Sequence, residues 1–364
     1  MKKESYINYI VYTLSTYNKV NKKTILDIYK KEGLAKKKDK QTTLFDSEYV
    51  DIDYNDFDTT LANCVIKKEK AVELYEKYQF TRSYRYSVLF KCNNFEKILI
   101  DINRIPEYKF DSNDIRLFDE FKMPKKLETS EDIILLFDRK FEAIHPQTSD
   151  ELLLHYPVLV VFHKNNKIIE FRFDTIKRLF IEGERNQSIY SEIVEQLLVY
   201  LEQEYDIKLE AIDLSFMKNI ANDENIEDIK LISQYMNMKN GSKAELNVGN
   251  NEEYVLPIIG ELKNIMNDLK EELDKNLKIK DALEQFIYEK EETTDYPWIE
   301  ILFLNKERIK TRNNHVKFVF NYMNKKYTLI TYYYNDTLIG MERMNDVTSF
   351  IGENIKKWFW HKPY

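Results

Sequence analysis

Hydrophobic and polar positions alternate most clearly between residues 156 and 214, where they predict a hairpin, a helix and a further strand. The apolar run 158–162 has the length of a strand buried on both faces. After the turn 164–167, apolar residues recur at every second position of 169–173, which leaves Glu170 and Arg172 on the face expected to be solvated. The segment therefore predicts a sheet with one face buried under a helix.

The helix of this segment is expected to begin at Ser188, because serine often caps a helix and an apolar stripe at spacing three to four follows it. Residues 207–214 then return to a strand pattern. Similar reasoning predicts helices over 1–80, a hairpin in 84–105, a strand at 133–137, a short helix at 226–235, one long amphipathic helix over 257–290 and strands over 297–340.

The order of these elements predicts an α+β fold, with an N-terminal helical unit, a central mixed or antiparallel sheet with packed helices, a long amphipathic helix and a C-terminal β-rich unit. At 364 residues the chain is too long for one ordinary core. We expect four parts: a basic helical domain (1–80), a central α/β domain built on hairpins (84–214), a helical segment (215–296) and a β-rich domain (297–364). Turns rich in Asn and Lys near residues 93, 165 and 324 leave an internal duplication open.

The composition, with 43% hydrophobic and 32% charged residues, is typical of a soluble, folded protein. No run approaches the roughly 20 apolar residues of a membrane span, so we expect no membrane partner. Cys64 and Cys92 cannot form a disulfide framework, and no apolar signal core follows the basic start. These features predict a cytoplasmic location.

The residues give little sign of catalysis. The sequence has no phosphate-binding glycine loop and no nucleophile elbow, and its five histidines show no metal-ligand spacing. Glu170 and Arg172, with Asp150 before them, only approximate a metal-dependent nuclease motif, because arginine is a poor replacement for a general-base lysine. We therefore expect no catalytic residue, no metal and no cofactor, and the sequence leans against an enzyme.

A basic segment at the N-terminus is the first feature that suggests a partner. Residues 1–40 hold eleven lysines against four acidic residues, although the formal net charge of the chain is −7. Clustered lysines neutralise phosphates without reading base sequence. The predicted nucleic-acid-binding residues here are Lys19, Lys22, Lys23, Lys30, Lys31, Lys36, Lys37 and Lys38.

A second basic set lies among aromatic residues in the C-terminal strands. Basic and aromatic side chains interleaved on a sheet can follow a phosphate backbone and stack on bases, although aromatic residues at spacing two are also typical of a core-facing strand. The predicted binding residues of this set are Arg308, Lys310, Arg312 and Lys317.

The sequence thus predicts a non-enzymatic protein that binds nucleic acid, DNA or RNA, through basic surface patches within a multi-protein complex of the bacterial or phage antiviral defence type. An alternative is an assembly subunit that acts by protein–protein contact alone, since the apolar seam of 257–290 suits a protein partner or a homo-oligomer. A hydrolase or nuclease with a scattered site is the remaining alternative.

Overall fold

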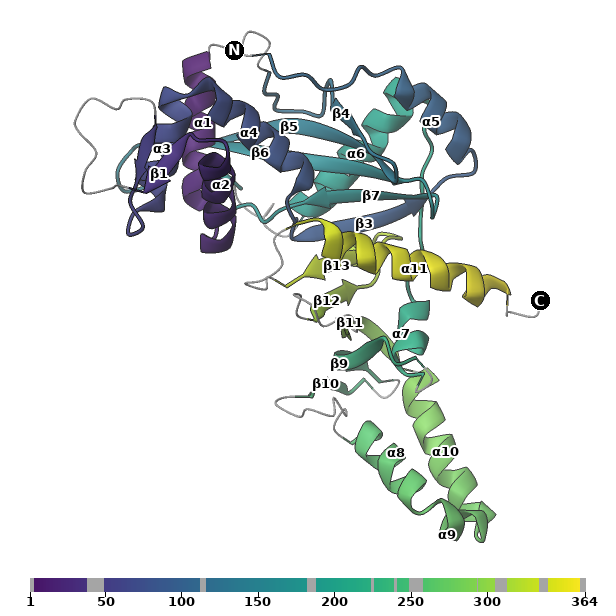
Figure 1. The fold of residues 1–364 in the computed structure, drawn as a ribbon. Coiled ribbons are helices and arrows are strands. Elements are labelled where there is room, and N and C mark those ends of the chain that lie inside the picture. Colours follow the sequence, from purple (N-terminus) through teal and green to yellow (C-terminus); the bar gives the residue numbers. More distant parts are fainter. Residues whose placement is uncertain are drawn as a thin grey trace. The chain divides into compact units, whose positions relative to one another are not determined.

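The computed structural model describes residues 3–37, 49–111, 116–181, 188–223, 226–238, 241–248, 258–292, 294–304, 313–333 and 340–360. Its contacts divide the chain into unit 1, Met1–Glu210 with Leu338–Gly352, and unit 2, Ala211–Thr337 with Glu353–Tyr364. Each unit combines helices with an antiparallel sheet (Figure 1), which confirms the α+β class. The four expected domain ranges stay a prediction.

The sheet of unit 1 is built around two long paired strands. The strand order is β3 (Tyr86–Lys91), β7 (Ile168–Phe173), β6 (Glu151–His163), β5 (Asp132–Ile144) and β4 (Lys125–Glu128), and all neighbours are antiparallel. β5 and β6 pair over their full thirteen residues, from Asp132 opposite His163 to Ile144 opposite Glu151. The expected buried strands at 133–137 and 158–162 and the hairpin at 164–167 are confirmed.

Four helices at the N-terminus form a cluster with its own apolar interior. They are α1 (Lys3–Thr16), α2 (Lys19–Lys31), α3 (Phe57–Lys67) and α4 (Glu69–Thr81), joined by the short parallel pair β1 (Ala35–Lys37) and β2 (Val50–Ile52). Asn18 caps α2 by accepting the backbone N–H of Asn21, and Gly33 follows its end with a φ of +72° that favours glycine. The predicted helical N-terminal unit is therefore confirmed.

Helices cover both faces of the unit 1 sheet. On one face, the Thr13 hydroxyl of α1 accepts the backbone N–H of His155 on β6 at 2.8 Å. On the other, Phe137 of β5 lies against Tyr200 of α6 (Ile189–Tyr205), with ring centroids 5.2 Å apart. The first part of α11 (Glu342–Trp360) packs on the α1 face, where its Asn345 and Thr348 contact β7.

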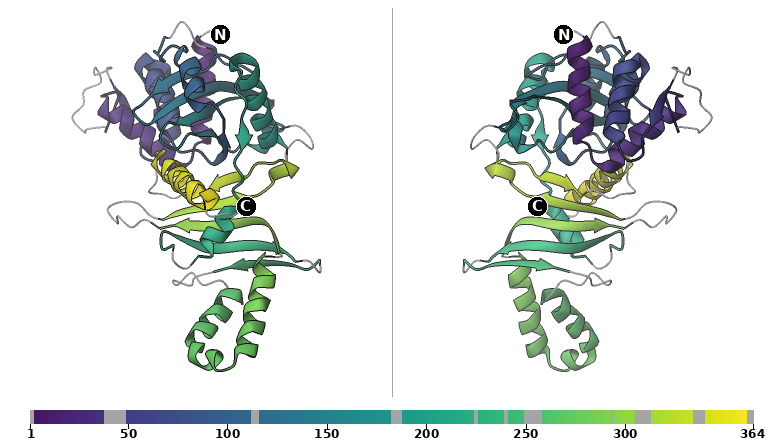
Figure 2. Two further views of the ribbon diagram at one scale, coloured as in Figure 1. Left: turned by 90° about the vertical axis from the view of Figure 1, so that its right-hand side faces the viewer. Right: turned by 90° about the vertical axis from the view of Figure 1, so that its left-hand side faces the viewer.

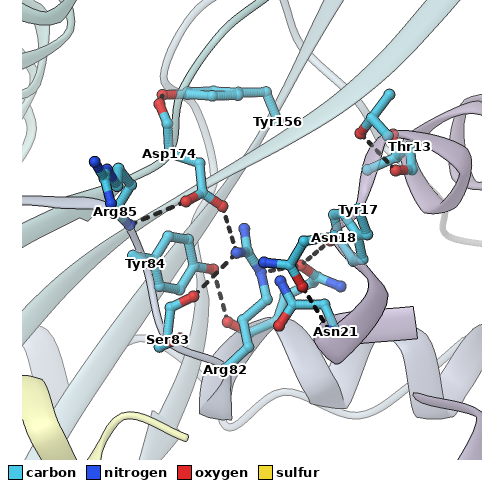
Figure 3. Close-up of polar contacts among 12 residues, drawn as sticks. Thr13, Tyr17, Asn18, Asn21, Arg82, Ser83, Tyr84, Arg85, Tyr156 and Asp174 are labelled. Carbon is cyan, nitrogen blue, oxygen red and sulfur yellow. Dashed lines mark hydrogen bonds and ion pairs between the residues drawn. The ribbon is translucent and has the colours of Figure 1, made fainter. Parts of the chain in front are cut away.

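A buried ion pair joins the end of α4 to the end of β7 (Figure 3). The Arg82 guanidinium contacts Asp174 and also donates from Nε to Gln79 at 2.8 Å. The ring of Tyr84 lies 3.9 Å from the guanidinium carbon, and Tyr156 donates to the Asp174 backbone carbonyl. These contacts fix the helical cluster against the sheet without leaving the buried charge unpaired.

The strands of unit 2 are also antiparallel to their neighbours. Their order is β10 (Lys243–Asn247), β9 (Ile229–Asn237), β11 (Asp295–Phe303), β12 (Asn314–Val319) and β13 (Leu329–Tyr332). The helix α7 (Phe216–Ala221) lies against one face, as Figure 2 shows, and packs on β9. Within the described parts of the chain, no helix has the length and apolar character needed to cross a membrane.

Three local expectations are wrong. Residues 98–102 lie on the helix α5 (Phe95–Asn103), not on a returning strand, because Ile98 and Ile102 at spacing four are buried while Ile100 is exposed. Residues 226–235 contribute to the strand β9 instead of a helix, and a register shift in its pairing with β11 disguises the alternation. In 207–214, only Glu210–Ala211 form a strand, β8.

The apolar seam of 257–290 is carried by three successive helices and not by one. They are α8 (Ile259–Asp268), α9 (Lys270–Asp274) and α10 (Leu277–Glu292). The chain leaves helical geometry at Leu269 and again near Lys275, where the seam loses its apolar repeat. Among the side chains of these helices that the structure describes, only Ile259 and Ile287 are buried, so most of the apolar ones face outward.

Candidate nucleic-acid interface

The two faces of the unit 2 sheet differ in character. One face is an apolar core, formed by Ile299, Ile301 and Phe303 of β11 with Val316 and Phe318 of β12. The alternate residues of the same strands are only half-buried, and they include polar and aromatic side chains beside the aliphatic Leu302 and Val319. We call the second surface the open face and define it by Tyr235, Trp298, Glu300, His315, Lys317 and Tyr333.

Two aromatic rings stack across the strands of the open face. Trp298 on β11 pairs directly with Tyr235 on β9, and their ring centroids lie 6.0 Å apart with an angle of 25° between the planes. The Lys317 ammonium nitrogen lies 3.3 Å from the Trp298 ring centroid. The indole thus contacts both a second ring and a cation, and these contacts are stabilised by stacking and by cation–π attraction.

Glu300 contacts both Lys317 and His315 on the open face. It lies opposite Lys317 on β12, and its Oε1 receives the Lys317 ammonium at 3.2 Å and the Tyr333 hydroxyl at 2.8 Å. His315 contacts Oε2 at 2.8 Å and stacks on Tyr333, with ring centroids 4.1 Å apart. Burial alone would raise the pKa of Glu300, but the hydrogen bonds from His315 and Tyr333 and the nearby positive charges outweigh it and lower this pKa to about 2.

This arrangement offers flat aromatic surfaces beside the Lys317 ammonium and the His315 imidazole, which both remain partly accessible. The side chain of Lys317 is 22% exposed and that of His315 is 34% exposed. Such a surface suits a ligand that has both a planar ring and a negative charge, which is the character of a nucleotide.

Some of the predicted N-terminal lysines are paired with carboxylates, and the others are exposed. Lys22 pairs with Asp58 of α3 at 2.6 Å and Lys30 pairs with Asp27 at 3.1 Å, so both are engaged within unit 1. Lys19, Lys23 and Lys31 recur along one exposed face of α2, and no carboxylate of the described residues forms an ion pair with them. Lys36 and Lys37 are also exposed, and Lys36 lies over the ring of Tyr49.

Four other predicted residues, Lys38, Arg308, Lys310 and Arg312, lie outside the described residues. Of the second basic set, Lys317 is described and lies on the open face, whereas Phe318 next to it belongs to the core. Sequence reasoning missed Tyr235, Trp298, Glu300 and His315 as site residues. Recognising β9 as a strand would have placed Tyr235 and Trp298 side by side.

Glu170 and Arg172 do not lie on a solvated face, as the sequence suggested. Both side chains are 0% exposed and form an ion pair of 2.5 Å. Glu170 lies opposite Val161, near the end of β6 that is remote from Asp150. A nuclease site built on these residues is not supported by this arrangement, because Glu170 already accepts hydrogen bonds from His163, Arg172 and Thr348.

The two histidines of β6, His155 within the strand and His163 at its end, are buried, and both ring nitrogens of each have partners. His155 contacts Tyr75 and Asp138, each at 2.8 Å. His163 contacts Asp132 at 2.8 Å and Glu170 at 2.9 Å. Since these contacts occupy every ring nitrogen, both histidines have structural roles in unit 1.

Comparisons with known proteins give the chain no relative: no protein-family model, no curated protein sequence and no solved structure matches it.

Proposed function

We propose that the protein binds single-stranded nucleic acid on the open face of unit 2. The observation that carries the proposal is the half-exposed stack of Trp298 on Tyr235, with the Lys317 ammonium 3.3 Å from the indole centroid. Unpaired bases expose their flat faces and stack on aromatic side chains, whereas the bases of a duplex are stacked on each other. The expected ligand is therefore a single strand.

Lys317 supplies the contact with the phosphate backbone. In the free protein its ammonium is paired with Glu300, so a phosphate has to compete with that carboxylate. This competition limits the affinity for anions that have no base to stack. Binding should also weaken as salt rises, because salt screens the attraction between Lys317 and the phosphate. His315, beside Glu300, offers a second hydrogen-bond donor on the same face.

The exposed lysines of α2 support the same function through a separate surface. Lys19, Lys23 and Lys31 recur at spacing four or eight, so they lie along one side of the helix. They add phosphate contacts that do not depend on base sequence. A chain with a net charge of −7 can bind nucleic acid in this way because the positive side chains are segregated.

The test is the binding of fluorescently labelled oligothymidylate, oligouridylate and a DNA duplex, followed by fluorescence anisotropy across a salt series. We expect the single strands to bind more tightly than the duplex. Trp298→Ala should weaken single-strand binding by about tenfold or more, since stacking contributes about 1–3 kcal/mol per base. Lys317→Glu should weaken it further at low salt.

Lys278→Glu is the matched control for Lys317→Glu, because Lys278 is an exposed lysine on α10 of the same unit. It makes the same charge change away from the open face. Single strands that bind the Trp298→Ala and Lys317→Glu variants as tightly as the unaltered chain would remove the open face from the proposal. No binding by the unaltered chain at low salt would reject the function itself.

A second candidate function is assembly through α8 and α10. Ile265 on α8 and Leu269 directly after its end are 53% and 48% exposed, and Ile279 and Phe286 on α10 are 50% and 44% exposed. Each pair recurs at a spacing of four or seven, so each helix has an apolar stripe that the described residues leave uncovered. Exposed apolar stripes of this kind are typical of protein–protein contact sites.

A second copy of the chain is the occupant that these helices favour. Acidic and basic residues are mixed along both helices, from Glu261 and Lys263 to Glu289 and Lys290, so two copies can pair without like charges dominating. Sedimentation velocity should show a dimer that Ile265→Lys with Phe286→Lys converts to a monomer. A monomer at every concentration of the unaltered chain would exclude this role.

A further inference from the structure

Four buried charged side chains meet beneath α11 in unit 1, and none of them belongs to the proposed nucleic-acid interface. They are Asp132 of β5, His163 of β6, and Glu170 and Arg172 of β7, and we call them the buried quartet. Asp132 lies directly opposite His163, and Glu170 lies opposite Val161, which is on the same face of β6 as His163. One carboxylate therefore reaches the His163 ring from each neighbouring strand.

The His163 ring bridges the two carboxylates. Its Nδ1 lies 2.8 Å from Asp132 Oδ1, and its Nε2 lies 2.9 Å from Glu170 Oε2. An ionised carboxylate only accepts hydrogen bonds, so both ring nitrogens have to donate, and only the charged imidazolium has two N–H groups. His163 therefore carries a proton on each ring nitrogen in this arrangement.

This proton balances the charges of the buried quartet, since His163 and Arg172 then match the two carboxylates. None of the four residues is more than 7% exposed, so water screens an imbalance poorly. Burial alone would lower the pKa of His163, but the hydrogen bonds to Asp132 and Glu170 outweigh it and raise this pKa above its ordinary value of 6.5. The charged side chains of the adjoining turn form ion pairs outside the quartet: Lys164 with Glu128 at 2.7 Å, and Lys167 with Glu96 at 3.0 Å.

The helix α11 is bonded to the buried quartet through two residues. The Thr348 hydroxyl donates to Glu170 Oε2 at 3.0 Å, and the Arg172 guanidinium donates to Asn345 at 2.7 Å. Arg172 also donates to Glu170 Oε2, so this one oxygen accepts hydrogen bonds from β6, β7 and α11. A change in the contact between His163 and Glu170 therefore acts directly on the bonds that attach α11.

Loss of the His163 proton disrupts this contact. A neutral imidazole donates from one ring nitrogen and has a lone pair on the other. Among the described residues, His163 is the sole hydrogen-bond donor to the Asp132 carboxylate, whereas Glu170 has Arg172 and Thr348 as further donors. The remaining proton thus stays on Nδ1, and the Nε2 lone pair faces Glu170 Oε2. The quartet is then left with one unbalanced negative charge in the interior, which is destabilising.

We infer that one proton on His163 controls the attachment of α11 to the sheet of unit 1, and that α11 loosens from the sheet when alkaline solution removes this proton. A group whose pKa is raised by folding stabilises the fold fully below its ordinary pKa and stops doing so as pH rises through the folded-state value. The attachment is therefore firm up to pH 6.5 and weakens above it. Histidine suits this role because its charge changes near neutral pH.

Nuclear magnetic resonance of the full chain labelled with nitrogen-15 histidine tests for the proton itself. At pH 7 both ring nitrogens of His163 should have the chemical shifts of protonated nitrogens. His163→Gln identifies these signals by removing them. A neutral His163 ring at pH 7, with one unprotonated nitrogen, would overturn the inference.

Thiol labelling measures the loosening of α11. Val347→Cys places a thiol on the buried side of α11, and Val72→Cys places one on α4 of the same unit, since these valines are 0% and 1% exposed. Both variants also carry Cys92→Ser. The ratio of their labelling rates cancels the rise in thiolate with pH. We expect this ratio to increase above pH 6.5 by up to about tenfold per pH unit, the limit for one proton.

Asp132→Asn, added to both thiol variants, is the matched control. Its amide can donate to His163 Nδ1 while Nε2 donates to Glu170, so a neutral ring no longer places a lone pair against a carboxylate. With this change the labelling ratio should stay constant with pH. A ratio that stays constant without the change would overturn the inference. An equal increase with and without it would assign the loosening to other groups and would overturn the inference as well.

Discussion

The Arg172 guanidinium donates to the Glu170 carboxylate across 2.5 Å, and both side chains are 0% exposed. His163 and Thr348 contact the same carboxylate oxygen at 2.9 Å and 3.0 Å. Arg172 also donates to Asn345 at 2.7 Å. The pair therefore links the strand β7 to the helix α11, two elements separated by about half of the sequence.

Removing one partner of this pair should be strongly destabilising, because the other would remain as a buried, unmatched charge. We expect Arg172→Met to lower the free energy of unfolding by about 3–5 kcal/mol, measured by urea denaturation. Arg178→Met is the control, since Arg178 is exposed on the short 3₁₀ helix at 178–180. Equal free energies of unfolding in the two variants would show that the buried pair contributes nothing.

The same carboxylate predicts how stability depends on pH in acid. Burial alone would raise the pKa of Glu170, but Arg172 and His163 outweigh it and lower this pKa to about 2. A lowered pKa in the folded state stabilises the fold above the ordinary value of 4.5 and stops doing so as pH falls toward about 2. The free energy of unfolding should therefore fall across this window.

Glu170→Gln removes this titration. Between pH 4.5 and about 2, the free energy of unfolding of this variant should change less steeply with pH than that of the unaltered chain. The two slopes should differ by up to about 1.4 kcal/mol per pH unit, which is the value for one proton. Hydrogen bonds to Asp132 and Glu170 outweigh burial and raise the pKa of His163 above 6.5, so this group keeps its proton throughout the window. If the free energy of unfolding falls with pH equally steeply in the variant and in the unaltered chain, the lowered pKa of Glu170 is contradicted.

The exposed lysines of α2 should contribute to the salt dependence of nucleic-acid binding. The triple change Lys19→Glu, Lys23→Glu and Lys31→Glu should reduce the slope of log affinity against log salt by about 2, since each lost contact to a single strand removes about 0.7. The measurement is fluorescence anisotropy with oligothymidylate. The control carries the same three changes at Lys270, Lys275 and Lys278, which are exposed in unit 2. If the control lowers the slope as much, net charge and not the α2 surface governs binding.

Short apolar runs predicted β5 and β6 from sequence, and a period-two pattern predicted β7. Most residues of all three strands are buried, on both faces of the sheet. The period-two pattern misplaced Glu170 and Arg172. Their burial depends on Asn345 and Thr348, which lie about 175 residues away and whose helix carries no local sign of where it packs. Sequence periodicity shows which face of a strand is polar, but it does not show what covers that face.

The open face was predictable only in part, for a related reason. Lys317 was predicted because it belongs to a basic cluster in the sequence. Its neighbours Trp298 and Tyr235 come together only through strand pairing, and the register shift in β9 makes its apolar positions resemble a helical spacing. Cross-strand pairs of this kind become visible once the register is known.

The two cysteines should differ sharply in reactivity. Cys64 is fully buried on α3, and burial raises the pKa of its thiol to about 12, so almost no thiolate forms at neutral pH. Cys92 is half-buried after β3, and burial raises its pKa as well, yet its sulfur remains partly accessible. With Ellman's reagent at pH 8, we expect Cys92 to react in the folded protein and Cys64 to react only when the helical cluster unfolds.

Cys92→Ser should therefore abolish labelling of the folded chain but leave labelling in denaturant. Rapid labelling of the folded Cys92→Ser variant would mean that the α1–α4 cluster opens readily, contrary to its closely packed interior.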